Sequence, residues 1–290
     1  MKKIIDSMKK IIDSMQSLGV AGSLPSGMVL MGNGKTGKSL EGRIESGVAC
    51  PLMKKVGNHF ASPLCPSCYA VSVLNNYSGV RNILATQNHS AQEIILRASG
   101  AEGKLTGTAI YPGERLRVYG LTDFRPRHLE TLKLLSKVYK LDIISKTLWH
   151  FIPCREALIE LARLPGICIS LSFNKRDKLA EMGGFKTIEE SIAACRIFIR
   201  KNKLQKSTSL NYTFTTQYRE TGRADMEPYQ RIPGVRVYHT VSKDKGALAA
   251  TIGIKGVCGM FDEAGRLIED FKKNKGSCLG CNFCRKGTAA

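Results

Sequence analysis

From Arg115 onward, the apolar and polar residues of the chain alternate with two different periodicities. Short runs rich in β-branched and aromatic residues alternate with longer segments whose apolar positions have helical spacing. The predicted strands are LRVYG, LDIIS, ICISLSF, SLNYTFT, VRVYHTV and AATIGI, and the predicted helices are HLETLKLLSKVY, CREALIELARL and IEESIAACRIFIRK. This alternation predicts consecutive βαβ units that share a parallel sheet.

The number of these units predicts the architecture of the chain. About five or six of them indicate an α/β protein with a partial or full parallel (β/α) barrel, for which about 250 residues is typical. An open, doubly wound sheet is the alternative. We expect residues 33–257 to form the barrel, after an extension of residues 1–32 and before a cysteine-rich segment of residues 258–290. A helix is expected over about residues 80–99.

Neither an export signal nor a membrane span is expected. The first fourteen residues, two copies of MKKIIDS, carry Asp6 and Asp13 among their apolar positions and do not fit a signal peptide. No apolar run approaches the roughly 18 residues that a membrane-spanning helix needs. The expected location is the cytoplasm, where the ten cysteines would be thiols or metal ligands rather than disulfides.

The C-terminal cysteines form the most specific motif. Cys278, Cys281 and Cys284 follow one another in a C-x2-C-x2-C run, and Cys258 lies upstream. Such a run is typical of a [4Fe–4S] cluster, to which Cys258 would add the fourth ligand. Zinc held by the same four thiolates is the alternative.

A second set of cysteines is one ligand short. Cys50, Cys65 and Cys68 would bind three irons of a second [4Fe–4S] cluster and leave the fourth iron open to a substrate or cofactor. A Cys3His zinc site that includes His59 is the alternative. The remaining cysteines have apolar neighbours and are expected in the core: Cys154, Cys168 and Cys195.

Polar residues follow several predicted strands. They are Leu121–Asp123, Lys146 and Thr147, then Ser170, Ser172 and Asn174, and finally Thr213, Thr215 and Thr216. Strand ends of a parallel barrel face one rim, where active sites are built. Each polar residue alone could equally serve as a helix cap or turn former.

Residues 32–39, GNGKTGKS, match the phosphate-binding pattern G-x4-G-K-[ST]. In that reading Lys38 binds phosphates and Ser39 binds magnesium. The motif also requires a following helix, whereas Gly42, Gly47 and Pro51 interrupt the next dozen residues. A glycine- and lysine-rich loop is therefore favoured over a nucleotide site.

The formal net charge of +20 points to a polyanionic partner such as nucleic acid. A basic run near the end of the third predicted helix could contribute to binding, or could simply be a solvated face: Arg196, Arg200, Lys201, Lys203 and Lys206.

The order NGKTG, CPSCYA, NNYSGVRNILATQNH, GLTDF, ISKT and C-x2-C-x2-C resembles the phage and plasmid proteins of the "gene product 88" family, over about residues 33–285. This resemblance implies a phage protein, or a plasmid protein, in the cytoplasm of its host cell. Because that family has no settled activity, the resemblance does not indicate a reaction.

The strand-end residues are similar to those of radical S-adenosylmethionine enzymes of the spore photoproduct lyase type. The similarity implies that the GLTD segment, with Thr122 and Asp123, contacts the cofactor and that Asp123 binds its amine. It further implies that Lys146 binds the cofactor carboxylate and that Ser172 or Asn174 binds the ribose. Those enzymes carry C-x3-C-x2-C, whereas fourteen residues separate Cys50 from Cys65 here.

Two functions are therefore expected from different classes. The first is a radical-SAM-like iron–sulfur enzyme with one open and one four-cysteine cluster, acting on an unknown substrate that could be nucleic acid. The alternative is a non-catalytic, metal-stapled phage protein that binds nucleic acid. A nucleotide hydrolase acting through Lys38 is a weaker third possibility.

Overall fold

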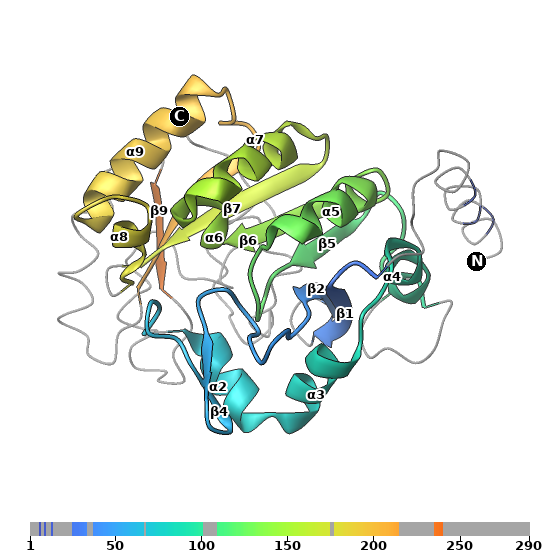
Figure 1. The fold of residues 1–290 in the computed structure, drawn as a ribbon. Coiled ribbons are helices and arrows are strands. Elements are labelled where there is room, and N and C mark those ends of the chain that lie inside the picture. Colours follow the sequence, from blue (N-terminus) through green and yellow to red (C-terminus); the bar gives the residue numbers. More distant parts are fainter. Residues whose placement is uncertain are drawn as a thin grey trace, which may run out of the picture.

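The computed structural model of the chain describes residues 25–33, 37–66, 68–100, 109–174, 177–214 and 235–239, together with residues 6, 9 and 13. Within these residues the protein is an α/β structure whose helices lie along a mostly parallel central sheet (Figure 1). Most of the N-terminal repeat, the predicted strand AATIGI and the whole segment 258–290 lie outside this part of the chain.

The central sheet has seven strands in the order β1-β2-β5-β6-β7-β8-β9. β1 and β2 form an antiparallel hairpin, and every other neighbouring pair is parallel. The strands are β1 (Met28–Asn33), β2 (Gly37–Gly42), β5 (Arg115–Val118), β6 (Lys140–Ser145), β7 (Ile167–Phe173), β8 (Thr208–Phe214) and β9 (Val235–His239). The described sheet is open, with β1 at one edge and β9 at the other, so the predicted full barrel is not confirmed.

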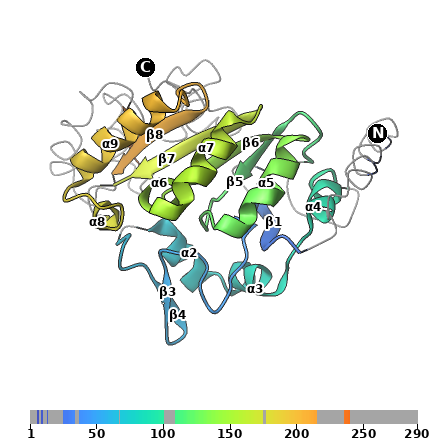
Figure 2. The same ribbon diagram turned by 45° about the horizontal axis from the view of Figure 1, so that its top comes forward.

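Five helices cover the same side of the sheet in Figures 1 and 2. They are α5 (Leu129–Ser136), α6 (Thr147–His150), α7 (Arg155–Arg163), α8 (Leu179–Met182) and α9 (Ile188–Lys201), with short 3-10 helices η1 (Pro126–His128) and η2 (Ile152–Cys154) before α5 and α7. This placement follows from topology, because right-handed crossovers between strands taken in sequence order all pass over one face. An order that reverses, as in a doubly wound sheet, is not seen among the described strands.

A separate group of short elements lies between β2 and β5 in the sequence. It consists of the hairpin β3 (Lys54–Val56) and β4 (His59–Ala61), and of α2 (Tyr69–Asn76), α3 (Ser78–Thr86) and α4 (Ala91–Ala98). Figure 2 shows the β3–β4 hairpin projecting from the body of the protein beside α2. Both cysteine-bearing loops of the described region border this hairpin.

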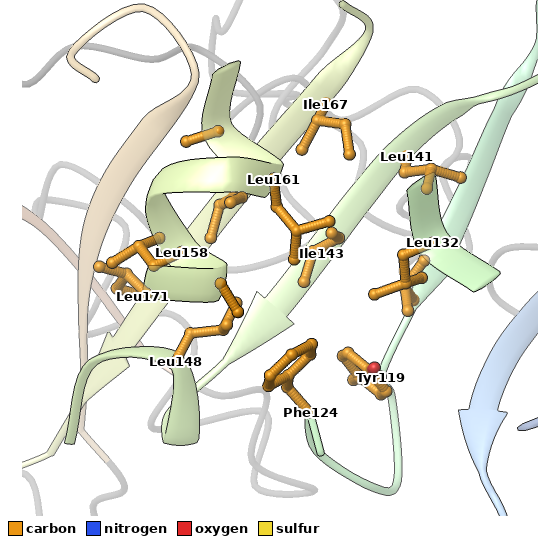
Figure 3. Close-up of a cluster of buried hydrophobic side chains, with 14 of the residues drawn as sticks. Tyr119, Phe124, Leu132, Leu141, Ile143, Leu148, Leu158, Leu161, Ile167 and Leu171 are labelled. Carbon is orange, nitrogen blue, oxygen red and sulfur yellow. The ribbon is translucent and has the colours of Figure 1, made fainter. Parts of the chain in front are cut away.

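The main core lies between the sheet and the helices. Alternate residues of β6 and β7 point toward α5 and α7, as Figure 3 shows for Leu141, Ile143, Ile167 and Leu171. Burying each such side chain contributes about 1.5–3 kcal/mol to the hydrophobic free energy of folding. The intervening residues of β7 therefore face the opposite side of the sheet, since side chains alternate along a strand.

Two expectations from the sequence need correction. The helix expected over residues 80–99 is two helices, α3 and α4, because Ser90 caps the second one through a reciprocal capping box with Glu93. The residue before that cap, His89, is tied to β1 by a backbone bridge to Met28. The predicted extension of residues 1–32 also contains most of β1, so the sheet begins before residue 33.

Across the ranges that the structure describes, no helix is long and apolar enough to cross a membrane.

Candidate functional site

Cys50, Cys65 and Cys68 lie in one apolar cluster at the carboxyl ends of the parallel strands. Cys50 and Cys65 are buried, and Cys68 packs against the same cluster. Leu121, which follows β5, and Leu179, which begins α8 after β7, also belong to or pack on this cluster. The structure therefore brings the three cysteines to the strand ends.

Local hydrogen bonds fix two of these cysteines. The amide of Cys68 donates to the carbonyl of Cys65 at 3.0 Å, which closes a four-residue turn. Pro66 stands at the second position of this turn, where its fixed φ is favourable. The amide of Leu52 donates to Sγ of Cys50 at 3.4 Å. Amide donors of this kind stabilise a thiolate when it serves as a metal ligand.

The ionisation of Cys50 and Cys65 depends on their burial and on the charges around them. Burial raises the pKa of Cys50 well above its usual range, and Asp123, Cys68 and Cys65 raise it further, against the amide of Leu52. Burial also raises the pKa of Cys65 to about 12, although the ammonium of Lys146 opposes this shift. The thiolate forms thus need a compensating positive charge, which a metal core would provide.

Zinc and an iron–sulfur core require different arrangements of their ligands. Zinc needs four donors around a single ion, at about 2.3 Å for sulfur. Among the described residues, no group of three or more His, Cys, Asp or Glu side chains could hold a metal ion. His59 lies on the exposed hairpin strand β4, opposite Val56, and does not complete a Cys3His group. An iron–sulfur core spaces its thiolates more widely, because each one binds a different iron.

Lys146 places a positive charge beside these cysteines. Its ammonium lies 3.8 Å from Sγ of Cys65 and forms an ion pair with the buried carboxylate of Asp177. Burial alone would lower the pKa of Lys146, but Asp177, Cys65 and Cys68 raise it above its usual value. The side chain keeps 24% of its surface exposed, so it can still contact a ligand.

The resemblance to radical S-adenosylmethionine enzymes implies that Asp123 binds the cofactor amine, but the structure surrounds its carboxylate with donors from the protein. Its Oδ1 accepts hydrogen bonds from the hydroxyls of Ser145 and Thr147, at 2.5 and 2.9 Å, and from the amide of Phe124 at 2.7 Å. Its Oδ2 accepts from the amides of Lys146 and Thr147, at 2.9 and 3.4 Å. These bonds use the acceptor capacity of the carboxylate, so its visible role is to hold the turn that carries Lys146.

Thr122 is similarly engaged by the protein itself. Its hydroxyl donates to Glu41 at 2.9 Å and accepts from the amide of Gly42 at 2.7 Å. Glu41 was missed in the sequence, where the one available signal was a carboxylate next to the apolar Leu40 in the strand. The structure makes Glu41 the residue that shapes the loop after β5.

Ser172 and Asn174 are both buried at the end of β7, on the same face as Ser170. Ser172 is in register with Asn211 of β8, whose side chain is also fully buried. Neither amide atom of Asn211 has a hydrogen-bond partner. This face of the sheet thus carries buried polar groups at the carboxyl ends of neighbouring parallel strands, where ligand sites are commonly built.

The part of residues 32–39 that the structure describes does not form a phosphate-binding loop. Lys38 and Ser39 lie in β2, the second strand of a hairpin, rather than between a strand and a helix. The ammonium of Lys38 donates to the carbonyls of Ala98 and Arg97, at 2.7 and 3.2 Å, at the end of α4. Lys38 is buried, and it caps a helix C-terminus rather than facing a ligand.

The remaining predicted residues are split between the surface and undescribed segments. Four residues of the predicted basic run, at the end of α9 and just after it, are exposed: Arg200, Lys201, Lys203 and Lys206. The fifth, Arg196, is half-buried. Thr215 and Thr216 and the C-terminal cysteines lie outside the described residues: Cys258, Cys278, Cys281 and Cys284. Of the three cysteines expected in the core, Cys154 and Cys195 are core residues, whereas Cys168 is only half-buried.

Comparisons with family models, with curated proteins and with solved structures found no match to this chain.

Proposed function

We propose that the chain is an iron–sulfur enzyme of the radical S-adenosylmethionine type, with Cys50, Cys65 and Cys68 as ligands of a [4Fe–4S] cluster. The observation that supports this most strongly is the convergence of these three cysteines at the carboxyl ends of parallel strands. The sequential strand order, with helices on one side, supports the proposal of a partial (β/α) barrel. The resemblance to the "gene product 88" proteins remains part of the same proposal.

The bound cofactors would supply one-electron chemistry that the side chains cannot perform. The protein contributes position, charge and exclusion of water. The ammonium of Lys146 would bind a carboxylate of the cofactor, since it is cationic, partly exposed and next to Cys65. Asp123 and Glu41 would act as positioning residues, because they hold the loops that carry Lys146 and Thr122.

Ser172 or Asn174 would bind the ribose of the same cofactor. Both residues lie at the carboxyl end of β7, the end of a parallel strand at which ligand sites are commonly built. The four C-terminal cysteines would bind a second [4Fe–4S] cluster. The apolar residues around Cys50 would keep water from the first one.

Binding of S-adenosylmethionine tests this assignment. In anaerobically reconstituted protein, the substitution Lys146→Met should weaken binding about tenfold or more, because it removes one charge-assisted bond. Lys178→Ala, which removes an exposed lysine from a neighbouring loop, serves as the control. No binding to the native protein, or equal binding by both variants, would rule out this function.

A second function is favoured by a separate observation. The exposed basic residues near the end of α9 form a surface suited to a nucleic acid backbone, in line with the net charge of +20. In that case the chain would be a metal-stapled binding protein. Affinity for nucleic acid should then fall steeply with salt, and a flat salt dependence would exclude it.

A further inference from the structure

Asp177 has one carboxylate oxygen that the protein does not satisfy. Its side chain is only 1% exposed, and one oxygen, Oδ2, is paired with Lys146. The other oxygen, Oδ1, is buried and forms no hydrogen bond of normal geometry. Leaving a buried carboxylate oxygen without a partner costs free energy, so such atoms usually indicate a ligand or a function.

The loop that carries Asp177 is fixed against the loop that carries Cys65. The amide of Lys178 donates to the carbonyl of Leu64 at 2.9 Å, so residues adjacent to Asp177 and Cys65 are directly bonded. The ammonium of Lys146 contacts both side chains and lies 3.8 Å from the sulfur. The carboxylate of Asp177 and the thiol of Cys65 are also close enough to interact, since each affects the pKa of the other.

Other candidates for a fourth ligand do not fit the geometry. Both oxygens of Asp123 are used by hydroxyls and amides of the strand ends. His59 lies on the exposed hairpin. Within the described ranges, Asp177 is the carboxylate with a buried and unpartnered oxygen.

We propose that Asp177 is an exchangeable fourth ligand of the iron–sulfur core held by Cys50, Cys65 and Cys68. This inference rests on the proposed function, because it requires that core. The carboxylate has two alternative partners, the iron at the fourth corner and the ammonium of Lys146. Pairing with Lys146 opens the corner to a cofactor, whereas release from Lys146 lets Asp177 close it.

The two states predict opposite effects for two substitutions. Asp177→Asn removes the anionic ligand, so the fourth iron should be lost more easily under mild oxidation. Lys146→Met removes the competing cation, so the same iron should be retained longer. Asp177→Cys supplies a stronger iron ligand and should retain the iron at least as well as the native residue.

The experiment measures conversion of four-iron to three-iron clusters in anaerobically reconstituted full-length protein exposed to ferricyanide. The paramagnetic three-iron signal and the iron released are followed with time. Asp177→Asn should react about tenfold faster than the native protein, which is the usual effect of losing a ligand-shell group. Lys146→Met should react more slowly, and Lys178→Ala should match the native protein. Any contribution of the C-terminal cysteines is common to all variants.

Equal rates for the native protein and Asp177→Asn, with equal iron content, would overturn the inference while leaving the proposed function intact. Fast iron loss in Asp177→Cys would also overturn it, because it would show that Asp177 serves only to maintain the fold. A native protein that binds no iron at all would instead overturn the proposed function.

Discussion

The hydroxyl of Thr122 donates a hydrogen bond of 2.9 Å to Oε2 of Glu41, a residue 81 positions earlier in the chain. Glu41 also accepts from the amides of Gly120, Leu121 and Thr122, at 2.8, 2.9 and 3.1 Å. A fully buried carboxylate thereby gathers successive amides of the loop after β5. The edge hairpin is in this way bonded to the strand-end loop beside the cysteines.

Replacing Glu41 with glutamine should destabilise the protein by roughly 3 kcal/mol, since hydrogen bonds to a buried charged acceptor are the strong ones. The amide group of glutamine would present hydrogens to some of these donors. Urea denaturation measures the change. Glu130→Gln, at an exposed carboxylate of α5, should change stability by less than about 0.5 kcal/mol. Equal effects of both substitutions would contradict this role of Glu41.

Acid should destabilise the fold through His128. Its Nδ1 accepts from the amide of Arg125 at 3.2 Å, so this nitrogen carries no proton and the hydroxyl of Tyr119 donates to it at 2.8 Å. Burial, followed by the charges of Arg127 and Arg125, lowers the pKa of His128 from 6.5 to about 3. The unfolded chain therefore binds more protons between these two values.

The stability contributed by neutral His128 should thus be complete above about pH 6.5 and decline by up to about 1.4 kcal/mol per pH unit down to about pH 3. Urea midpoints at several pH values measure this decline. In His128→Asn, whose side-chain oxygen can accept in place of Nδ1, the decline should be shallower. Identical pH profiles for the two proteins would show that His128 does not cause it.

Lys38 should matter for stability and not for nucleotide binding. Lys38→Met keeps the apolar stem but removes the two charge-assisted hydrogen bonds to the carbonyls of Arg97 and Ala98, which should cost about 1–3 kcal/mol. Lys201→Met, at an exposed lysine, should have little effect. Thermal unfolding and ATP titration of both variants test this. ATP binding that disappears in Lys38→Met while stability is unchanged would restore the phosphate-binding interpretation.

Much of the α/β pattern could be predicted from local sequence. β6, β7 and α9 appear within about one residue of the runs LDIIS, ICISLSF and IEESIAACRIFIRK, because alternation and helical spacing there agree with burial. The break at residues 87–90 was not predicted. Its local signal was the capping box of Ser90 and Glu93, whereas the bridge between His89 and Met28 joins residues that are distant in the sequence.

In the candidate site, too, interactions between residues that are distant in the sequence could not be predicted. Cys50, Cys65 and Cys68 were identified from their spacing, and Lys146 from its position after a strand. Asp177 and Glu41 were not, because their importance comes from partners 31 and 81 residues away. The local pattern also suggested that Asp123 faces a ligand, whereas its hydrogen bonds to Ser145 and Thr147 appear only in three dimensions.

The central claim, that Cys50, Cys65 and Cys68 bind an iron–sulfur core, is tested most directly by iron and sulfide analysis. The protein would be reconstituted anaerobically in a variant without the terminal run, carrying Cys278→Ala, Cys281→Ala and Cys284→Ala. The account predicts about four irons and four sulfides per chain, lost when Cys65→Ala is added. They should be kept with Cys154→Ala, which removes a core thiol instead. Stoichiometric zinc, or an iron content that does not depend on Cys65, would contradict it.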